Sequence, residues 1–397
     1  MLDVVTKDEA VETVRRFSGT APGTEKVGIA DALHRVLSRD ILSSEDVPPF
    51  DRSTVDGFAV RAADTFGAGD AIPSQLEVAG EILMGEKAGF TLKSGQCAKI
   101  STGGMLPGGA DAAVPVEHAD CRDGLCLVYK AASPNENVTK KGDDIAAGEI
   151  ALKKGTVLTP AGVGVLAALG VYEVPVFRKP VIAVISTGDE IADGAPEDGQ
   201  IRDINTYLLS AAIRERGCEV YAYGAVRDDK DGIEKALISC LERSDAVIIS
   251  GGSSAGARDM TVDIIGGLGT AYFHGIAMKP GKPTIFGTVG NKPVFGLPGH
   301  PLAAYFVFRL IVTEYIGKIL CLPADRPVKT GVLKENIPSN HGREEYICVK
   351  LSGNNEIEPV HTKSGIISVL GEADGFIKIA RDTEGLPEGA AAEIYKL

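Results

Sequence analysis

Two carboxylates, Asp51 and Asp56, stand in the mostly apolar segment 47–60, VPPFDRSTVDGFAV. Its paired prolines favour an extended entry, and Asp56-Gly57 is typical of a tight turn that a strand over 58–60 would anchor. A buried or half-buried carboxylate needs a cation or hydrogen-bond donors, so this segment could carry acid chemistry. The alternative is a turn whose Asp caps its own backbone, and the segment alone leaves both interpretations open.

Polar clusters also follow three apolar runs farther along the chain. The clusters are Ser186-Thr187-Gly188-Asp189-Glu190, then Arg227-Asp228-Asp229, and then 250–259, SGGSSAGARD, which contains Gly251, Gly252, Ser253 and Asp259. Backbone N–H groups of small residues can approach a phosphate closely, and carboxylates can hold a metal ion. Singly, a Gly-Ser loop is equally a plain flexible turn, and an Asp pair is more often a helix N-cap. Three clusters in equivalent positions favour a ligand site.

Lys279 and Lys282 lie in a Lys-Pro-Gly-Lys-Pro turn. The segment 275–282, GIAMKPGK, faintly resembles a Walker A loop, but five residues separate its glycines and Pro283 stands where Ser or Thr would hold magnesium. It is therefore not a P-loop. A rigid turn of this kind can aim two ammonium groups at one oxyanion, and the alternative is a pair of solvated surface lysines.

The turn 296–301, GLPGHP, leads from a predicted strand into a helix, so N–H groups near Pro298 and Gly299 are available to an anion. His300 in this turn could act as a catalytic base. A structural hydrogen-bonding role is the favoured interpretation for a histidine in such a turn.

The elements that position these residues alternate between strand and helix from residue 180 onward. The expected strands are 181–185, 219–225 and 246–250, followed by a hairpin of 284–286 and 293–297. Helices are expected at 205–216 and 302–316. A further helix lies between the second and third strands, and its apolar face consists of Ile233, Ala236, Leu237, Cys240 and Leu241. This alternation predicts a doubly wound sheet whose ligands lie beyond the carboxyl ends of the strands. Each polar cluster falls at such an end.

The rest of the 397-residue chain, which exceeds one hydrophobic core, divides into further units. Expected elements are helices at 7–17, 30–37 and 160–170, the last capped by Thr159, and strands at 75–82, 95–100, 112–116, 125–129, 345–351 and 375–380. The predicted domains are 1–46 plus 141–178, an elongated and helical N-terminal domain; 47–140, an inserted β-rich module; 179–322, the α/β domain; and 323–397, a C-terminal β-barrel or sandwich.

Composition narrows the class of partner. The formal net charge of -13 argues against a broad nucleic-acid or anionic-membrane surface. No signal-like or bilayer-length apolar segment is seen, which predicts a soluble cytoplasmic protein. The seven cysteines lack zinc spacing, so reduced structural thiols are expected.

Seven ordered motifs, PPFDRSTVDGFAV, ISTGG, ISTGDEI, GQIRDINTYLL, SGGSSAGARD, MKPGKP and GLPGHP, together resemble the molybdopterin molybdenumtransferases, the MoeA and gephyrin E-domain family. The resemblance covers essentially the whole chain. It implies an enzyme of molybdenum cofactor synthesis with a MogA-like α/β domain. Such an enzyme inserts molybdate into adenylylated molybdopterin with release of AMP, and it depends on Mg2+.

The resemblance also implies site residues. Catalytic positions would be Asp56, Thr102, Glu190, Asp228, Asp259 and Lys279, and the Mg2+ ligands would come from Asp56, Glu190, Asp228 and Asp259, with the choice among these four open. Pterin and phosphate would meet Thr187, Gly188, Gly251, Gly252, Ser253, Pro298 and Gly299. Molybdate, a tetrahedral dianion, would meet Lys279, Lys282, Pro283, Arg343 and Ser364.

In the family, the positions of Asp56 and Thr102 complete the site of a second subunit in a homodimer, which would leave Asp51 as a structural cap of its turn. Contact with the molybdopterin adenylyltransferase is a further expected partnership. Some relatives carry Lys at the position of Gly275. Met and Tyr are common at the positions of Val55 and Phe58, and Tyr is frequent at the position of Arg202. Tungstate insertion and a non-catalytic pterin-binding scaffold are the alternative functions.

Overall fold

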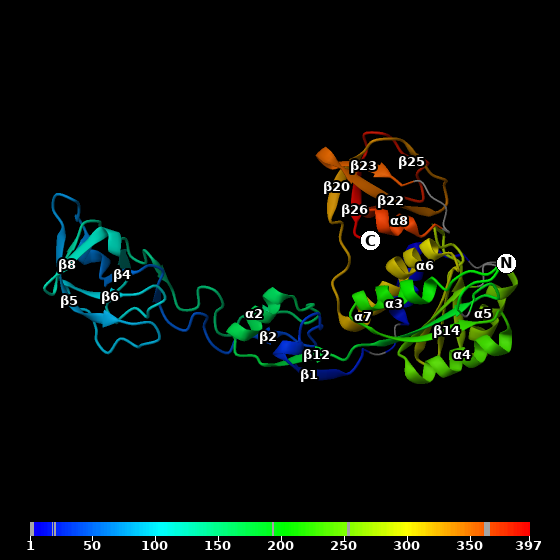
Figure 1. Ribbon diagram of the computed structural model, residues 1–397, viewed down its shortest axis with the longest axis horizontal. Helices are drawn as coiled ribbons and strands as arrows, with labels where there is room; N and C mark the ends of the chain where they lie inside the picture. Colours follow the sequence, from blue (N-terminus) through cyan, green and yellow to red (C-terminus); the bar gives the residue numbers. More distant parts are fainter. Residues whose placement is uncertain (1–3, 18, 20, 193, 252–254, 361–365) are drawn as a thin grey trace.

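The computed structural model describes residues 4–17, 19, 21–192, 194–251, 255–360 and 366–397, and leaves the side chains of 255–259 and 354 outside its description. The molecule is elongated (Figure 1). A small β module (cyan) forms one end, short strands and a helix lie in the middle, and the α/β sheet and a β-barrel (orange and red) form the other end.

A six-stranded sheet in the order β14-β13-β15-β19-β18-β16 forms the centre of the α/β region. The strands are β13 (Val181–Thr187), β14 (Glu219–Val226), β15 (Ala246–Gly251), β16 (Thr270–His274), β18 (Ile285–Val289) and β19 (Lys292–Leu297). The first four strands of that order are parallel, and β18 runs antiparallel to both of its neighbours. The predicted strands and the hairpin are confirmed.

Helices cover both faces of this sheet. They are α3 (Asn205–Glu215), α4 (Lys230–Arg243), α5 (Ala255–Leu268), α6 (Pro301–Val307) and α7 (Thr313–Leu320), the last two joined by a π-helical turn, Phe308–Val312. Helices α3, α6 and α7 pack with Ile182 and Phe295 on one face, and α4 packs with Ile185 and Val247 on the other. Each fully buried side chain of this size contributes about 1.5–3 kcal/mol. The predicted doubly wound fold is confirmed.

Residues 250–259 are predicted to form one loop, whereas helix α5 begins at Ala255. The first turn of α5 contains mostly small residues, and among the described side chains of this helix the buried apolar ones, Ile264 and Ile265, lie in the third turn. The usual helical spacing is therefore absent where the helix starts. Asp259 belongs to this helix rather than to the loop after β15.

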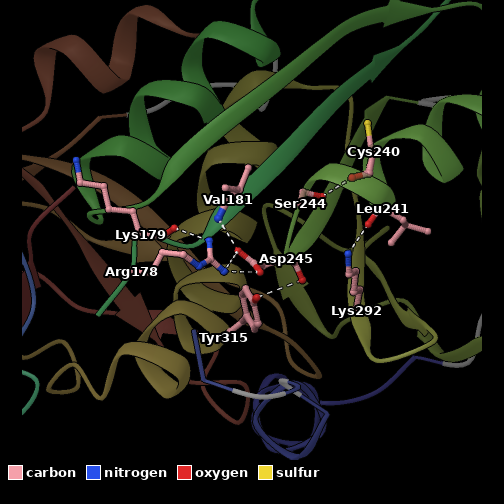
Figure 2. Close-up of polar contacts among 9 residues, drawn as sticks. All are labelled: Arg178, Lys179, Val181, Cys240, Leu241, Ser244, Asp245, Lys292 and Tyr315. Atoms are coloured by element: carbon pink, nitrogen blue, oxygen red, sulfur yellow. Dashed lines mark hydrogen bonds and ion pairs between the residues drawn. The ribbon is translucent and has the colours of Figure 1, made fainter. Parts of the chain in front are cut away.

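Asp245, which directly precedes β15, forms hydrogen bonds that link the amino ends of β13 and β15 (Figure 2). Its carboxylate accepts hydrogen bonds from Arg178 at 2.8 and 3.0 Å and from the Val181 N–H at 2.7 Å. Tyr315 of α7 donates to the Asp245 carbonyl oxygen at 3.4 Å. This anchor lies at the opposite end of the strands from the polar clusters, so it holds the sheet without entering the candidate site.

The β-rich module is a six-stranded sheet in the order β7-β4-β6-β5-β9-β8. Its strands are β4 (Gly57–Val60), β5 (Ser74–Ile82), β6 (Gln96–Ile100), β7 (Ala112–Pro115), β8 (Ala119–Arg122) and β9 (Leu125–Val128). All four residues of β4 are buried. The turn that contains Asp56 is therefore fixed at one end by a buried strand, as the apolar run after it predicts.

The C-terminal region contains a closed five-stranded barrel, because β22 pairs with both β23 and β24. The barrel strands are β20 (Lys329–Leu333), β22 (Glu344–Ser352), β23 (Glu356–Pro359), β24 (Gly375–Ile379) and β26 (Ala391–Tyr395). Around it lie β21 (Ile337–Pro338), β25 (Gly385–Leu386) and helix α8 (Ser368–Glu372). Strand β17 (Met278–Lys279) of the α/β region adds to the edge of β22. The predicted barrel is confirmed.

Helix α1 (Lys7–Arg16) confirms the first predicted helix, and a capping box of Thr6 and Glu9 starts it. It buries Ala10 and Val14 in the core of the α/β region, and Arg15 pairs with Glu314 of α7 at 2.7 Å. The predicted helix 30–37 is wrong. Only the 3-10 turn Ile29–Asp31 forms there, because the following backbone hydrogen-bonds to distant strands instead.

A helical N-terminal domain is consequently not confirmed. The middle of the molecule consists of helix α2 (Pro160–Ala168), capped by Thr159 as predicted, and three short ladders. These ladders are β1 (Thr24–Gly28) with β12 (Glu173–Phe177), β2 (Ile41–Leu42) with β11 (Ile150–Leu152), and β3 (Arg52–Ser53) with β10 (Val138–Thr139). The four predicted domain ranges stay a prediction.

Cys121 and Cys126, directly opposite each other on β8 and β9, form a disulfide. The expectation of reduced thiols is therefore wrong for this pair, although the other five cysteines are free. Burial raises the pKa of the Cys97 thiol to about 11, so that thiol stays protonated. No helix in the described ranges has the length and apolar character needed to cross a membrane.

Candidate functional site

The carboxyl ends of β13, β15 and β19 bring three predicted groups together. Thr187 pairs with Gly251, and Ser250 pairs with Leu297, so the loops that follow these strands start side by side. A side chain added at Gly299 would lie only 3.5 Å from the Gly251 Cα. The structure thus places Thr187, Gly188, Gly251, Pro298 and Gly299 at one edge of the sheet, as the doubly wound pattern predicts.

Gly251 has no room for a side chain. Its φ is +153°, and an added Cβ would lie 2.1 Å from the Thr187 carbonyl oxygen and 2.3 Å from the Thr187 Oγ1. The backbone of β15 therefore lies directly against the end of β13. Glycine at this position is required by the packing of the two strand ends, and it leaves the loop that follows β15 free of a bulky side chain at its start.

Asn205, the first residue of α3, hydrogen-bonds to residues at the ends of β15 and β19. Its Nδ2 donates to the Ser250 Oγ at 2.9 Å and to the Gly299 carbonyl oxygen at 2.8 Å. Its Oδ1 is buried and accepts no hydrogen bond within the described residues. The motif GQIRDINTYLL contains Asn205, but a role for this residue could not be predicted, because its partners lie 45 and 94 residues away in sequence.

Acidic residues gather at the ends of β13 and β14. The Asp228 N–H donates to the Asp189 Oδ1 at 3.3 Å. Burial raises the pKa of the Asp228 carboxyl; a hydrogen bond from Thr187 opposes this, and the nearby charges of Glu190 and Asp189 add to it. The Asp228 Oδ1 is buried and has no hydrogen-bond partner in the described part of the chain. Mutually repelling carboxylates with an unpaired oxygen are suited to a cation.

Mg2+ fits these residues. It binds oxygen ligands and usually takes only one or two carboxylates, together with phosphate oxygens and water. The described residues contain no group of three or more His, Cys, Asp or Glu side chains arranged to hold a metal. Of the predicted ligands whose side chains are described, Asp228 and Glu190 lie at these strand ends, whereas Asp56 directly precedes β4, in the module at the other end of the molecule (Figure 1).

A cleft of about 990 Å³ lies between the α/β region and the barrel. Its wall combines the Lys-Pro-Gly-Lys-Pro turn, the GLPGHP turn and strand β22. Predicted site residues in this wall are Lys279, Lys282, Pro283, Pro298 and Arg343, and apolar residues in it include Met278, Leu302, Phe306 and Ile337. His300 also lines the cleft, at the start of α6, and its side chain does not cap that helix.

The three cations of the cleft differ in their surroundings. The Lys279 ammonium contacts the buried carboxylate of Glu345. The exposed Lys282 and the half-buried Arg343 also line a second cavity of about 400 Å³. The Arg343 Nε is buried, and within the described residues it donates to no acceptor. A buried guanidinium N–H without an acceptor costs free energy, and an oxyanion would remove that cost.

Asp56 and Thr102 lie together, but not with the other predicted residues. The Thr102 N–H donates to the Asp56 Oδ1 at 2.8 Å, and both residues are exposed in the single chain, so burial of Asp56 would require a second copy. Asp51 does not cap this turn: it accepts from the Lys141 N–H at 2.8 Å and from Lys140 at 3.0 Å. Burial opposes its ionisation, but these two hydrogen bonds outweigh it and lower the Asp51 pKa.

Several predicted positions fall outside the described residues. Gly252, Ser253 and Ser364 lie there, as does the side chain of Asp259. Glu345, in contrast, is described and lines the cleft, although the sequence analysis gives it no role. Glu345 lies two residues after the predicted site residue Arg343, but its partner Lys279 is 66 residues away in sequence.

Glycine-lined strand ends beside a cleft with three cations define a protein that binds an anionic small molecule through a doubly wound domain. Three family models match the chain: "MoeA N-terminal region (domain I and II)" at 5–170, "Probable molybdopterin binding domain" at 183–318 and "MoeA C-terminal region (domain IV)" at 330–397. The chain belongs to the MoeA family of molybdopterin molybdenumtransferases, and it is a transferase of molybdenum cofactor biosynthesis.

Relatives and solved structures agree with this family. Molybdopterin molybdenumtransferase 2 of Mycobacterium tuberculosis is 33% identical over 397 residues, covering 95% of each chain. A Pyrococcus horikoshii molybdopterin biosynthesis MoeA structure is 32% identical with a TM-score of 0.88, covering 99% of this chain and 100% of that one. A second structure of a MoeA protein is 42% identical with a TM-score of 0.83, covering 99% of each chain.

Proposed function

We propose that this transferase inserts molybdate into adenylylated molybdopterin and releases AMP in a Mg2+-dependent reaction. The observation that carries the proposal is the buried Arg343 Nε, which lacks an acceptor in the described residues and lines the same cleft as Lys279 and Lys282. Three cationic groups that converge on one cleft are suited to a small tetrahedral dianion.

The adenylylated pterin would lie across the carboxyl ends of β13, β15 and β19. Its pyrophosphate could approach the glycine backbone of these strand ends, above all at Gly299, where an added Cβ would meet only the Gly251 backbone. Pro298 lines the cleft and also belongs to the strand-end turn, so the two parts of the site adjoin. This continuity supports a reaction between an oxyanion in the cleft and a pterin at the strand ends.

Asp228 and Glu190 are the proposed Mg2+ ligands within this chain, and the Asp259 side chain is a further candidate. Bound Mg2+ would neutralise charge on the pyrophosphate whose cleavage releases AMP. Before it binds, Asp228 and Glu190 repel each other. Lys279, Lys282 and Arg343 would orient the oxyanion toward the pterin, and the apolar wall of the cleft would limit access of water.

Asp56 and Thr102 are proposed to complete the site of a second copy in a homodimer. Within one chain they are exposed, and they adjoin strands β4 and β6 of the module at the opposite end of the molecule from the α/β sheet and the barrel (Figure 1). An exposed acid anchored by a backbone N–H is suited to such a role. We further propose that contact with the adenylyltransferase delivers the adenylylated pterin to this protein, in the cytoplasm.

The test is AMP release from adenylylated molybdopterin bound to the purified protein. Release that requires both molybdate and Mg2+ supports the proposal. Release with tungstate alone would favour the alternative oxyanion, and pterin binding without any AMP release would favour a scaffold.

Gly275 stands where some relatives carry lysine. Its φ is +128°, and an added Cβ would lie 3.1 Å from Val4, so a lysine at this position would be strained.

A further inference from the structure

The ammonium of Lys279 already has an anionic partner. Lys279 of β17 and Glu345 of β22 are paired in register, and their side chains form an ion pair. The second carboxylate oxygen of Glu345 accepts from the Ser339 Oγ at 2.8 Å. Both oxygens of Glu345 are thus held by donors, and the pair joins the α/β region to the barrel.

Glu345 is unusual in its burial. It is 6% exposed, and it is the only buried acidic or basic residue among those the structure describes. Its carboxylate lines the same cleft as Lys279, Lys282 and Arg343. The field of a buried charge is screened much less by salt and water than that of a surface charge. An oxyanion in this cleft therefore meets three cations and one carboxylate.

We propose that Glu345 is a positioning residue that acts through Lys279 and competes with the oxyanion for its ammonium. The inference rests on the proposed binding of molybdate in this cleft. An oxyanion that takes Lys279 must share its ammonium with Glu345. Glu345 therefore holds Lys279 at the cleft wall and also makes the oxyanion bind less tightly than three unopposed cations would.

Removing the charge of Glu345 should increase the affinity of the cleft for molybdate. Glu345→Gln keeps the size of the side chain and a hydrogen-bond acceptor for Lys279, but it removes the charge that attracts the ammonium. The oxyanion then gains an unshared cation and loses a repelling carboxylate. We expect molybdate to bind roughly 3- to 10-fold more tightly, a fold-change typical of removing one partly screened charge. Loss of a merely structural residue would not tighten binding.

A neighbouring acid supplies the matched control. Glu344 lies on the same strand, but its carboxylate contacts Tyr346 and Lys378 rather than the cleft. Glu344→Gln changes the net charge of the protein by the same amount. Its affinity for molybdate should stay within about twofold of wild type, because the Glu344 carboxylate is paired with Lys378 and contacts no cation of the cleft.

The experiment is calorimetric titration of the full chain with molybdate, without pterin, for wild type, E345Q, E344Q, K279A and the double variant K279A/E345Q. Tighter binding by E345Q alone, with the gain absent in the K279A background, supports the proposal. Unchanged or weaker binding by E345Q overturns it. An equal gain in E344Q, or an undiminished gain without Lys279, also overturns it.

A second variant covers the case in which E345Q is unstable, and the binding readout separates this proposal from the proposed function. If E345Q melts early, Glu345→Met, which is uncharged and of similar volume, carries the same expectation. The readout does not need turnover, so a protein that binds molybdate but never releases AMP would overturn the proposed function while leaving the Glu345 result intact. A wild type that binds no molybdate would overturn both.

Discussion

The backbone N–H of Thr102 donates a hydrogen bond to the Asp56 Oδ1 at 2.8 Å. This contact joins the loop after β6 to the turn before β4, so two motifs separated by 46 residues present one exposed surface. The carboxylate is fixed in place without being buried.

Replacing Asp56 by Ala should abolish molybdate insertion and leave the protein folded and its oligomeric state unchanged. Asp56 is exposed and its removal opens no cavity, so the melting temperature should change by no more than about 1 °C. Turnover and size-exclusion chromatography check this. Normal turnover by the purified variant would refute the assigned role.

Replacing Asp51 by Ala provides the contrast. Asp51 holds Lys140 and the Lys141 backbone through charge-assisted hydrogen bonds, so its loss should destabilise the β module by about 1–3 kcal/mol. Activity below the melting transition should persist. Denaturation followed by circular dichroism measures the effect, and an unchanged unfolding curve would show that these hydrogen bonds contribute little.

Arg343→Ala should weaken molybdate binding by about 1.5–3 kcal/mol, roughly 10- to 150-fold, because a charged donor is lost from the cleft. Lys279→Ala should have a smaller effect, since its ammonium is shared with Glu345. Both variants should bind pterin almost as wild type does. Lys350→Ala is the control, because Lys350 lies in β22, the strand that begins directly after Arg343, and it is paired with Glu372. Equal losses of oxyanion and pterin affinity would count against a separate oxyanion site.

Gly251→Ala should displace the end of β15 and abolish pterin binding. The added Cβ would meet the Thr187 carbonyl at 2.1 Å, and overpacking of this kind costs about 1–3 kcal/mol. Gly267→Ala in α5 is the matched change, because nothing lies within 4 Å of its added Cβ. That variant should be neutral or slightly more stable. Pterin binding by Gly251→Ala at wild-type affinity would contradict the strand-end site.

The raised pKa of Asp228 predicts a pH-dependent stability. Between its ordinary value of 3.8 and its raised folded value, the native state binds the proton more tightly than the unfolded state does. Stability from this group is therefore fully present below about pH 3.8 and is lost as pH rises through the folded pKa. Asp228→Asn should raise the melting temperature at pH 7 by about 1–2 °C and leave it unchanged near pH 3.

Added Mg2+ should reduce or reverse the difference in melting temperature between Asp228→Asn and the wild type at pH 7. It should stabilise the wild type at pH 7 more than it stabilises Asp228→Asn, because the variant lacks a ligand charge. Thermal melts with and without Mg2+ check both expectations. Equal Mg2+ effects on the two proteins would remove Asp228 from the metal site.

The sheet could be predicted from sequence because buried parallel strands read as continuous apolar runs, and their ends are marked by polar clusters. Such patterns are local. The rule that parallel strand ends meet at one edge then places Thr187, Gly251 and Gly299 together.

Long-range contacts could not be predicted in the same way. Segment 30–37 has helical spacing, but its backbone bonds to distant strands, and Leu37 forms a bridge with Val176. The role of Glu345 depends on a partner 66 residues away, and Asp56 shows its exposure only once the turn is built. Local pattern identifies residue types, whereas tertiary pairing decides which charges meet.

The central claim is that the chain couples molybdate in the cleft to cleavage of an adenylylated pterin at the strand ends. Quantifying AMP released from bound adenylylated molybdopterin after adding Mg2+ and molybdate, together and separately, tests it most directly. The account predicts stoichiometric AMP release only with both additions, and none from Asp56→Ala. AMP release that is independent of molybdate, or no release from the wild type with both present, would contradict it.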